Sequence, residues 1–374
     1  MSSRLRGGGG GTWRGFPGGL DAVLVLLTAL LVSVAVVNLN SAGAGDWTGL
    51  VRGQIGFVLV GAVAMFTVAF LDYRVLYRLG YTIYGVGLAL VVLVAVVGVT
   101  TNSAERWLRL GMLTFQPSEP MKLFLILGIA RYLQELSESS LAGTIRGLII
   151  PGVMTVVPAA LILQQPDLST SVVLGLIALS MLALAQLTLR STLILSLLGV
   201  SGMMLGWRLL MEDYQRERID VWLNPETHAE GAGYQILQAR IAVGNGGIFG
   251  RGVGEGSQNL LNFVPYKESD FAFAVFAEEW GFLGGCMLLL VVFVLVAWLL
   301  NLASQARDRF SALVCVGVAA LFFWHTVLNV GVVLEFIPNT GLPLPFFTHG
   351  GSNVVTMMLS LGVVSSISRA RRER

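Results

Sequence analysis

Residues 244–281 read GNGGIFGRGVGEGSQNLLNFVPYKESDFAFAVFAEEWG, and they join two regions of different character. The first half is glycine-rich and polar, so it cannot form a regular membrane-spanning helix. The second half begins an apolar helix, and Asp270 stands at the junction between the halves. A polar loop that brings a carboxylate to the mouth of an apolar helix bundle is where we expect chemistry.

The composition around this stretch is that of a membrane protein. The 374 residues are 55% hydrophobic and 12% charged, with a mean hydropathy of +0.76. Soluble domains carry roughly 25% charged residues. We therefore predict an all-α polytopic membrane protein. Cys286 and Cys315 both lie in apolar segments, where we expect them to pack as apolar residues rather than to form a disulfide.

Apolar runs long enough to cross about 30 Å of hydrocarbon recur along the chain. They predict about ten spanning helices, near residues 20–40, 55–72, 79–99, 118–134, 147–164, 169–188, 191–211, 270–300, 310–334 and 351–368. One transmembrane domain would then cover residues 19–368. A disordered tail at 1–18, which has no secretory signal pattern, would precede it, and a short tail at 369–374 would follow.

The distribution of arginine predicts the orientation. With the N-terminus inside, the cytoplasmic segments hold most of the arginines, and the opposite short loops hold only Arg52, Arg106 and Arg109. Cytoplasmic loops carry an excess of basic residues, so both termini are expected in the cytoplasm. The longest loop, 212–269, would then lie outside. Its segment Gly233–Val243 is amphipathic and could lie in the membrane interface or pack on top of the bundle.

Ionisable residues within or beside the predicted spans are candidates for function, because they are costly there. Ser118 can cap the fourth span, and Glu119 and Lys122 follow it three residues apart on one helical face. Their pairing could hold helices together, or the pair could bind substrate phosphate. Ser269 is a fitting cap for the eighth span, which would place Asp270 in its first turn. There Asp270 could act in chemistry or only complement the helix dipole.

Other polar groups of the spans are Glu278 and Glu279, His325, Glu335 and His349. Two adjacent carboxylates in a membrane helix are expected to pair with a neighbouring helix, to protonate or to face a polar cavity. The three histidines show no metal-ligand spacing, which disfavours a dedicated metal site. No GxxxxGK[ST] motif is present, which disfavours ATP-driven transport.

Six motifs carry a resemblance to a known family. They are RWLRLGMLTFQPSEPMKL, QQPDLST, YQRERIDVWLNP, GYQILQARIAVGNGGIFGRGVGEGSQ, FVPYKESDFAFAVFAEEWG and GLPLPFFTHGGSN, and they span about Arg106 to Asn353. In this order they resemble the SEDS family (shape, elongation, division and sporulation). The motifs YQRERI, LNP, AVFAEEWG and GLPLPF are more similar to the elongation members, the RodA type, than to the division members, the FtsW type.

The resemblance implies a ten-helix peptidoglycan glycosyltransferase that polymerises lipid II on the outer face of the bacterial cytoplasmic membrane. It also implies a class B penicillin-binding protein, a transpeptidase, as partner, docked near the eighth and ninth spans. The family's essential aspartate falls on Asp270, and its paired acid and base fall on Glu119 and Lys122. Tyr266, Glu268 and Ser269 depart from the family's usual PE.HTDF motif, and His349 and Asn353 depart from its SYGGSS motif.

The reaction implied is a displacement at a sugar C1 with diphosphate leaving. Asp270 would take the proton of the acceptor 4-hydroxyl as general base. The candidate substrate-binding residues are Arg106, Glu119, Lys122, Arg251, Gln258 and Lys267. Their cations would neutralise the diphosphate, alone or with a divalent cation such as Mg²⁺ or Mn²⁺. The glycines of 244–256 would let the loop approach the glycan closely.

Three other functions remain open at this point. The chain could be a lipid II flippase, a septal polymerase of the division type, or a scaffold without catalytic activity for cell-wall synthases. For the docking of the transpeptidase, small residues of the eighth and ninth spans would permit close helix approach: Gly281, Gly284, Gly285, Ala319 and Ala320. The alternative is that these small residues only pack the bundle internally.

Overall fold

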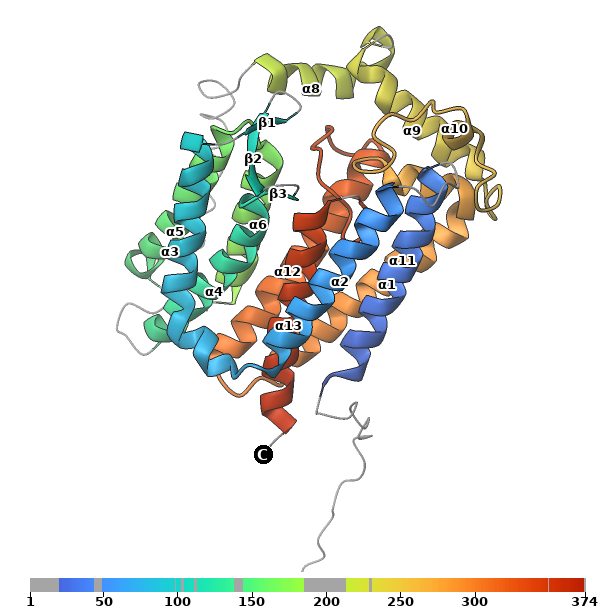
Figure 1. Ribbon diagram of the computed structural model, residues 1–374. Helices are drawn as coiled ribbons and strands as arrows, with labels where there is room; N and C mark the ends of the chain where they lie inside the picture. The colour runs from blue at the N-terminus through green and yellow to red at the C-terminus, as the bar shows by residue number, and fades with distance from the viewer. Residues whose placement is uncertain are drawn as a thin grey trace, which may run out of the picture.

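The structure is a computed structural model that describes residues 20–43, 49–97, 99–101, 104–110, 113–137, 144–184, 213–228, 231–348 and 350–372. The described chain is mostly helical. Most of its helices run in a bundle, and α8, α9 and α10 cap the upper end of the bundle in Figure 1. Every predicted span except 191–211 falls on a helix. Residues 191–211 and the predicted tail 1–18 lie outside the described residues.

The helices of the bundle have the following bounds. They are α1 Ala22–Ala42, α2 Gly49–Phe70, α3 Tyr73–Val97, α4 Ser118–Ser137, α5 Ile145–Leu163, α6 Leu168–Ala183, α11 Ala272–Ser304, α12 Arg309–Val333 and α13 Gly351–Arg372. The third helix begins six residues before its predicted start at residue 79, because only a short turn at Leu71 and Asp72 separates it from α2.

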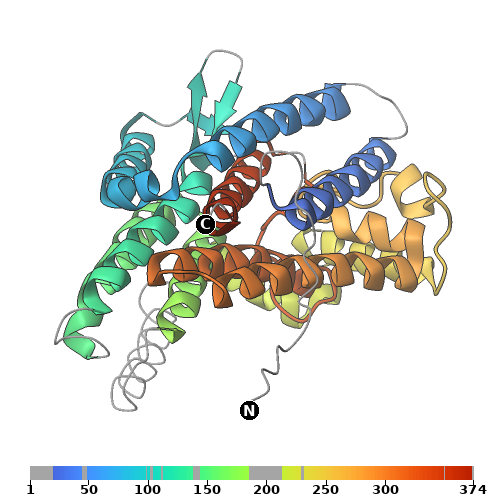
Figure 2. The ribbon, with the colours of Figure 1, turned by 90° about the horizontal axis from the view of Figure 1, so that it is seen from below.

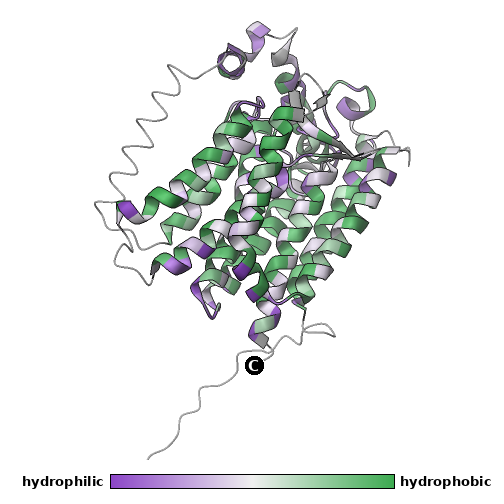
Figure 3. Ribbon diagram, turned by 60° about the vertical axis from the view of Figure 1, so that its left-hand side comes forward, coloured by the Kyte–Doolittle hydropathy of each residue, from purple (hydrophilic) through white to green (hydrophobic). Residues whose placement is uncertain are grey.

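Within the described residues, seven helices are long and apolar enough to cross a membrane: α1, α2, α3, α5, α11, α12 and α13. Helix α6 is apolar but shorter. Helix α4 carries Glu119, Lys122, Arg131 and Glu135, and it is nevertheless largely buried among its neighbours. Hydrophobic residues cover the length of the bundle, while hydrophilic residues gather at its ends (Figure 3). The chain is therefore a multi-pass membrane protein.

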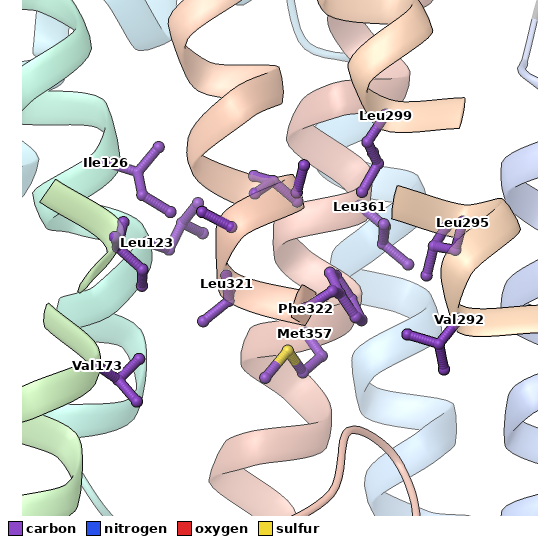
Figure 4. Packing of buried hydrophobic residues seen from close by; sticks show 14 of the residues in the cluster. Leu123, Ile126, Val173, Val292, Leu295, Leu299, Leu321, Phe322, Met357 and Leu361 are labelled. Atoms are coloured by element: carbon purple, nitrogen blue, oxygen red, sulfur yellow. The ribbon is translucent and has the colours of Figure 1, made fainter. Parts of the chain in front are cut away.

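Two helices near the C-terminus form the centre of the bundle. The apolar segments of α12 and α13 are 72% and 83% buried, whereas those of α2 and α3 are each only 22% buried. Helix α13 packs along α2 and also contacts α4 and α12 (Figure 2). Leucine, isoleucine, valine, phenylalanine and methionine side chains of α4, α6, α11, α12 and α13 interdigitate in the core (Figure 4). This core holds the ends of the helices in place on both sides of the bundle.

The link between α3 and α4 adds a small β element to the predicted all-α architecture. It contains three short strands, β1 Val99–Thr101, β2 Ala104–Leu110 and β3 Leu113–Phe115, paired antiparallel in the order β1-β2-β3. Leu108 of β2 pairs with Phe115 of β3. Residues 108–110 (LRL) and 113–115 (LTF) alternate apolar and polar residues, which is the strand period that a search for apolar spans does not detect.

The predicted outer loop 212–269 is mostly helical. It contains α8 Asp213–Leu223, a 3-10 turn η1 Pro225–His228, α9 Ala232–Gly246 and α10 Ser257–Leu260. Helix α9 confirms the amphipathic segment, and it packs on α11 rather than lying apart from the bundle. Its buried face carries Ile236, Ala239 and Ala242, whereas Ile241 is 43% exposed. Alanines form this face because they allow α9 to approach α11 closely.

The glycine-rich loop after α9 docks on a break in α11. Helix α11 is interrupted at Gly281, which has φ 67° and ψ −169°. There the amides of Phe282 and Leu283 donate to the carbonyl oxygens of Gly247 and Ile248, at 2.9 and 3.1 Å. A Cβ on Gly250 would lie 2.1 Å from the carbonyl oxygen of Glu279. Gly250 and Gly281 are thus required for backbone contact between loop and helix, and the approach of the loop to a glycan stays a prediction.

Candidate active site

A polar cavity of about 370 Å³ opens where α4, α6 and α8 meet the segments before α11 and before α13. Five of the six quoted motifs contribute residues to its wall, and the motif of 233–258 does not. Its ionisable and amide side chains are Gln116, Glu119, Asp167, Arg218, Asp270 and Asn353. Residues that are distant in the sequence therefore meet in one place.

Asp270 lines this cavity and is partly exposed to it. The prediction that Ser269 caps the helix and that Asp270 lies in its first turn is wrong. Helix α11 begins at Ala272, and Asp270 lies in the preceding turn. Gly341, with φ 67°, faces it so closely that a Cβ there would lie 3.4 Å from Asp270 Oδ2. The Asp270 carboxylate thus projects from the turn before α11 toward the loop that contains Gly341.

Asn329 fixes that turn, and the sequence analysis did not identify it. Its buried Nδ2 donates to the main-chain oxygen of Asp270 at 3.0 Å and to that of Leu342 at 2.7 Å. The amide thereby ties together the two segments that flank the Asp270 carboxylate. A single asparagine in the apolar span 309–333 is the signal that could have identified it, because a buried amide in a membrane helix needs partners.

The predicted ion pair between Glu119 and Lys122 is confirmed. Lys122 Nζ lies 2.8 Å from Glu119 Oε1, and the two side chains are 0% and 5% exposed. Asn353 Nδ2 donates to the other oxygen, Glu119 Oε2, at 2.8 Å. Glu119 and Asn353 line the cavity, whereas Lys122 lies behind them. The carboxylate of Glu119 is therefore held by donors from α4 and α13.

His325 completes this network from α12. Its Nε2 lies 3.0 Å from Lys122 Nζ, and its Nδ1 lies 3.1 Å from the carbonyl oxygen of Pro343. A histidine in a membrane helix could have been a packing residue only, but here both ring nitrogens have partners. His325 links the ion pair to the cavity wall at Pro343.

Two further charged residues of the cavity were quoted in motifs without a role. Arg218 of α8 reaches the cavity and donates through Nη1 to the main-chain oxygen of Asn339 at 3.3 Å. Asp167 caps α6, because its side chain accepts from the amide and hydroxyl of Thr170 at 3.1 and 3.0 Å. Gln116 Nε2 also donates to Asp167 at 3.3 Å. Arg218 thus brings a cationic side chain to the cavity wall.

Three predicted substrate-binding residues lie away from the cavity wall, in the loop docked on α11. Arg251 is exposed, and its Nε donates to the main-chain oxygen of Asn245 at 2.8 Å. The main-chain amide of Gln258 donates to Glu278 Oε1 at 3.0 Å. Lys267 is buried, and its Nζ donates to Asn259 and Asn262 at 2.6 to 3.0 Å. Burial lowers the pKa of Lys267 from its usual value, and the charges of Glu268 and Glu279 oppose that shift.

Arg106 lies in β2, and its side chain is outside the described part of the structure. His349 is likewise outside the described residues. Glu335, a further candidate of the sequence analysis, forms an ion pair with Arg240 of α9 at 3.4 Å and does not line the cavity. It therefore joins α9 to the end of α12.

Glu278 and Glu279 are both buried and serve the docked loop. Glu278 accepts from Ser257 Oγ and from the amides of Gln258 and Asn259, at 3.0 to 3.3 Å, and so caps α10. Glu279 accepts from Ser41 Oγ of α1 and from Asn259 Nδ2. Of the three expected outcomes for these carboxylates, the structure shows pairing with neighbouring polar groups.

The described residues contain no group of three or more histidine, cysteine, aspartate or glutamate side chains placed to hold a metal ion. In the cavity, Glu119 and Asp167 are already engaged by Lys122, Asn353 and Thr170. A divalent cation would therefore have to be held largely by the ligand's own oxygens, with Asp270 as the nearest carboxylate.

The small residues proposed as a docking face lie inside the bundle. Gly281, Gly284, Gly285, Ala319 and Ala320 are all buried within the chain. At Gly284, for instance, a Cβ would lie 2.3 Å from Trp280 Cβ. These residues therefore pack α11 and α12 internally, which was the alternative that the sequence left open.

Comparison with known proteins adds independent observations. The family model FTSW_RODA_SPOVE, described as "Cell cycle protein", matches residues 20–373. Peptidoglycan glycosyltransferase MrdB of Escherichia coli (strain K12) is 35% identical over 351 residues, which cover 94% of this chain and 93% of that protein. Stage V sporulation protein E of Bacillus subtilis (strain 168) is 33% identical and covers 94% of this chain and 98% of its own.

Solved structures agree with these matches. A chain of the structure described as "Structural coordination of polymerization and crosslinking by a peptidoglycan synthase complex" is similar at a TM-score of 0.81, with 32% identity. The match covers 95% of this chain and 99% of that one. The rod shape determining protein RodA of Thermus thermophilus is similar at a TM-score of 0.71, with 30% identity, covering 95% and 98% of the two chains.

Proposed function

The chain belongs to the FtsW/RodA/SpoVE family, and from this membership we propose that it is a peptidoglycan glycosyltransferase that polymerises lipid II with Asp270 as general base. One observation carries the assignment of the site: five motifs converge on a single polar cavity, and Asp270 projects into it. The substrate is lipid II and the growing glycan strand, and the released group is undecaprenyl diphosphate.

Asp270 is suited to take a proton from the acceptor sugar. It is a carboxylate on a turn that Asn329 holds in position, and it faces Gly341. A positioned carboxylate that accepts the proton of the 4-hydroxyl as the new bond forms contributes typically 10²- to 10⁴-fold in rate. The new bond joins that hydroxyl oxygen to the donor sugar C1, and the bond from C1 to diphosphate breaks.

Arg218 is the cavity cation that can neutralise the leaving diphosphate, because guanidinium binds phosphate oxygens in a bidentate manner. Lys122 is engaged by Glu119 and His325 and therefore acts on the substrate through Glu119. Thr340 Oγ1, Thr348 Oγ1 and Asn353 Oδ1 are buried oxygens for which the described residues supply no partner. They are positions where sugar hydroxyls can donate. A divalent cation would add charge neutralisation at the diphosphate.

The test is purified protein with fluorescent lipid II, analysed for polymer on a gel. Glycan strands that lengthen with time support the proposal. A flippase would instead move lipid II across the membrane of vesicles without forming polymer. In the described part of the chain, Glu278, Glu279 and His325 do not line an open path for lipid II, because all three are buried and hydrogen-bonded. Transport without polymer would overturn the proposal.

We assign the cavity to the outer face of the bacterial cytoplasmic membrane, with both termini in the cytoplasm, from the arginine bias. Glu255 is exposed in the loop docked near the start of α11, and Ser304 is exposed at the last residue of α11. In a background without Cys286 and Cys315, a cysteine at position 255 should react with an impermeant reagent in intact cells. A cysteine at position 304 should react only after lysis. The reverse pattern would overturn the orientation.

A class B transpeptidase remains the proposed partner, and elongation the proposed process, with septal synthesis the alternative. The exposed side chains of α11 and α12 offer a docking face: Met287, Leu290, Phe293, Phe323 and Val327, between 42% and 69% exposed. Met287, Leu290 and Phe293 recur every three residues and so share one face of α11. The small residues of these helices are buried and take no part in this face.

A further inference from the structure

Two further cavities lie outside the active site, one at the opposite end of the bundle and one along its length. One, of about 270 Å³, is lined by Leu71, Asp72, Tyr73, Arg74, Arg307, Ser366, Arg369 and Ala370. It lies near the C-terminal end of α13, whereas Asn353 of the active-site cavity lies near the start of the same helix. The sixteen residues between Asn353 and Arg369 correspond to roughly 24 Å of helix. This second cavity is therefore remote from the reaction.

The other cavity is an apolar groove of about 290 Å³ between α2, α3, α4 and α13. It follows the same helix faces as the second cavity. Val363 of α13 lines the groove, and Ser366 of the same helix lines the second cavity. Val68 of α2 lines the groove, and Leu71, in the turn just after α2, lines the second cavity. Residues three apart in a helix are neighbours on one face, so the apolar groove begins about one turn from the arginines.

The second cavity carries an excess of positive charge. Three arginines line it and Asp72 is its acidic residue. Arg307 donates through Nη2 to the main-chain oxygen of Arg371 at 2.7 Å, and Arg369 donates to that of Phe70 at 2.8 Å. Among the residues that the structure describes, neither Arg74 nor Arg307 forms an ion pair with a carboxylate. Arg307 is thus held by a neutral acceptor, and the second cavity presents cationic side chains to an anion.

Large apolar side chains are exposed on the segments that line this cavity. They are Phe70, Leu71, Val75 and Leu79, which are 42% to 51% exposed. Large apolar side chains are stable in such exposed positions when they face lipid. The arginines therefore lie where lipid headgroups meet acyl chains, and the groove runs from there toward the interior of the bilayer.

We propose that this end of the bundle binds an anionic glycerophospholipid with a glycerol headgroup, phosphatidylglycerol, from the inner leaflet. The phosphate lies against Arg74, Arg307 and Arg369, because guanidinium matches phosphate geometry and basic pockets between membrane helices bind anionic headgroups. A headgroup hydroxyl donates to Asp72, and an acyl chain fills the apolar groove. A prenyl diphosphate has no headgroup hydroxyl beside its phosphates, and its second phosphate would be repelled by Asp72.

The first arm of the test uses native mass spectrometry of the delipidated full chain in detergent, titrated with dioleoyl phosphatidylglycerol. Wild type is expected to bind one lipid tightly and dioleoyl phosphatidylcholine weakly. Arg74→Gln with Arg307→Gln should lower the affinity for phosphatidylglycerol by roughly 30-fold, since each basic residue near an anionic group contributes on the order of fivefold. The matched control Arg78→Gln removes an arginine of α3 that lies outside both cavities.

The second arm tests the groove and the identity of the ligand. Thr82→Trp places a large ring in the groove and should weaken binding, whereas Leu93→Trp, at an exposed position of α3 outside the groove, should not. Melting temperatures of all variants establish that they are folded. Equal affinity in the double arginine variant and wild type would overturn the site. Displacement of phosphatidylglycerol by equimolar undecaprenyl diphosphate, or by inorganic phosphate, would overturn the assigned lipid.

Discussion

Lys122 Nζ lies 3.0 Å from His325 Nε2, and this distance determines the tautomer of the histidine. His325 Nδ1 lies 3.1 Å from the carbonyl oxygen of Pro343, which can only accept, so Nδ1 carries the proton. Nε2 is then the acceptor for the Lys122 ammonium. A buried ammonium thus has Glu119 and His325 as partners, and the network joins α4 and α12 to the wall of the active site.

Replacing Asp270 by asparagine is expected to reduce lipid II polymerisation by about 10²- to 10⁴-fold, because the amide cannot accept the proton of the acceptor hydroxyl. Folding should be unaffected, since the hydrogen bond from Asn329 goes to the main chain of Asp270. Polymer yield and melting temperature are measured on the same preparation. Asp213→Asn on α8, which is exposed, is the control and should retain activity. A fully active Asp270→Asn variant would exclude the base role.

Breaking the Glu119–Lys122 pair from one side is expected to cost about 3–5 kcal/mol of stability, because it leaves a buried charge uncompensated. Glu119→Gln with Lys122→Met should cost less than the sum of the two single changes, with a coupling of about 0.5–3 kcal/mol. Denaturation of the four proteins in detergent gives the coupling. The exposed pair Asp213–Arg216 is the control and should show no measurable coupling. Additive effects at 119 and 122 would contradict the pairing.

His325→Leu is expected to destabilise the protein by about 1–3 kcal/mol, because it leaves Lys122 and the Pro343 carbonyl each without a buried partner. His325→Gln should retain most of the stability and activity, because its amide can donate to Pro343 and accept from Lys122. Melting temperature and polymer yield compare the two variants. If the leucine variant equals the glutamine variant in both measurements, the histidine serves only to fill space.

The lowered pKa of Lys267 predicts that the stability of the protein depends on pH in the alkaline range. Its pKa in the folded protein is lowered by burial from the usual 10.5, so between the two values the unfolded chain binds more protons than the folded chain. The contribution of Lys267 to the free energy of unfolding therefore rises with pH through the folded pKa and levels off above 10.5. Lys267→Met should remove this rise. Parallel pH profiles for wild type and variant would contradict the prediction.

Met287→Ala with Phe293→Ala is expected to reduce co-purification of the transpeptidase by roughly tenfold, because truncation of central apolar contacts commonly costs more than about 1 kcal/mol each. Polymerisation by the isolated protein should be unchanged. The control is Leu59→Ala with Val63→Ala on α2, whose side chains are 62% and 68% exposed. If the control pair reduces co-purification and the α11 pair does not, the docking face lies on α2.

Much of the helical framework was predictable because it depends on local sequence. Apolar runs of sufficient length locate the spans, since the bilayer requires internally bonded helices. The Glu119–Lys122 pair followed from spacing on one helical face, and the motifs identified the family. Asp270 was identified through the same resemblance. Its local structure was predicted wrongly, because a serine that can cap a helix does not show where the helix begins.

Tertiary structure alone decided which of these residues meet. Lys267 and Arg251 looked like outer cations, but the break in α11 at Gly281 draws their loop onto the helix and away from the cavity. Asn329 and His325 look like isolated polar residues in an apolar span, and their partners lie in segments that the fold brings to them. Sequence patterns report the period and polarity of single elements, which follow from nearest neighbours along the chain. The active site depends on contacts between distant segments, and only the packing of the whole bundle sets these.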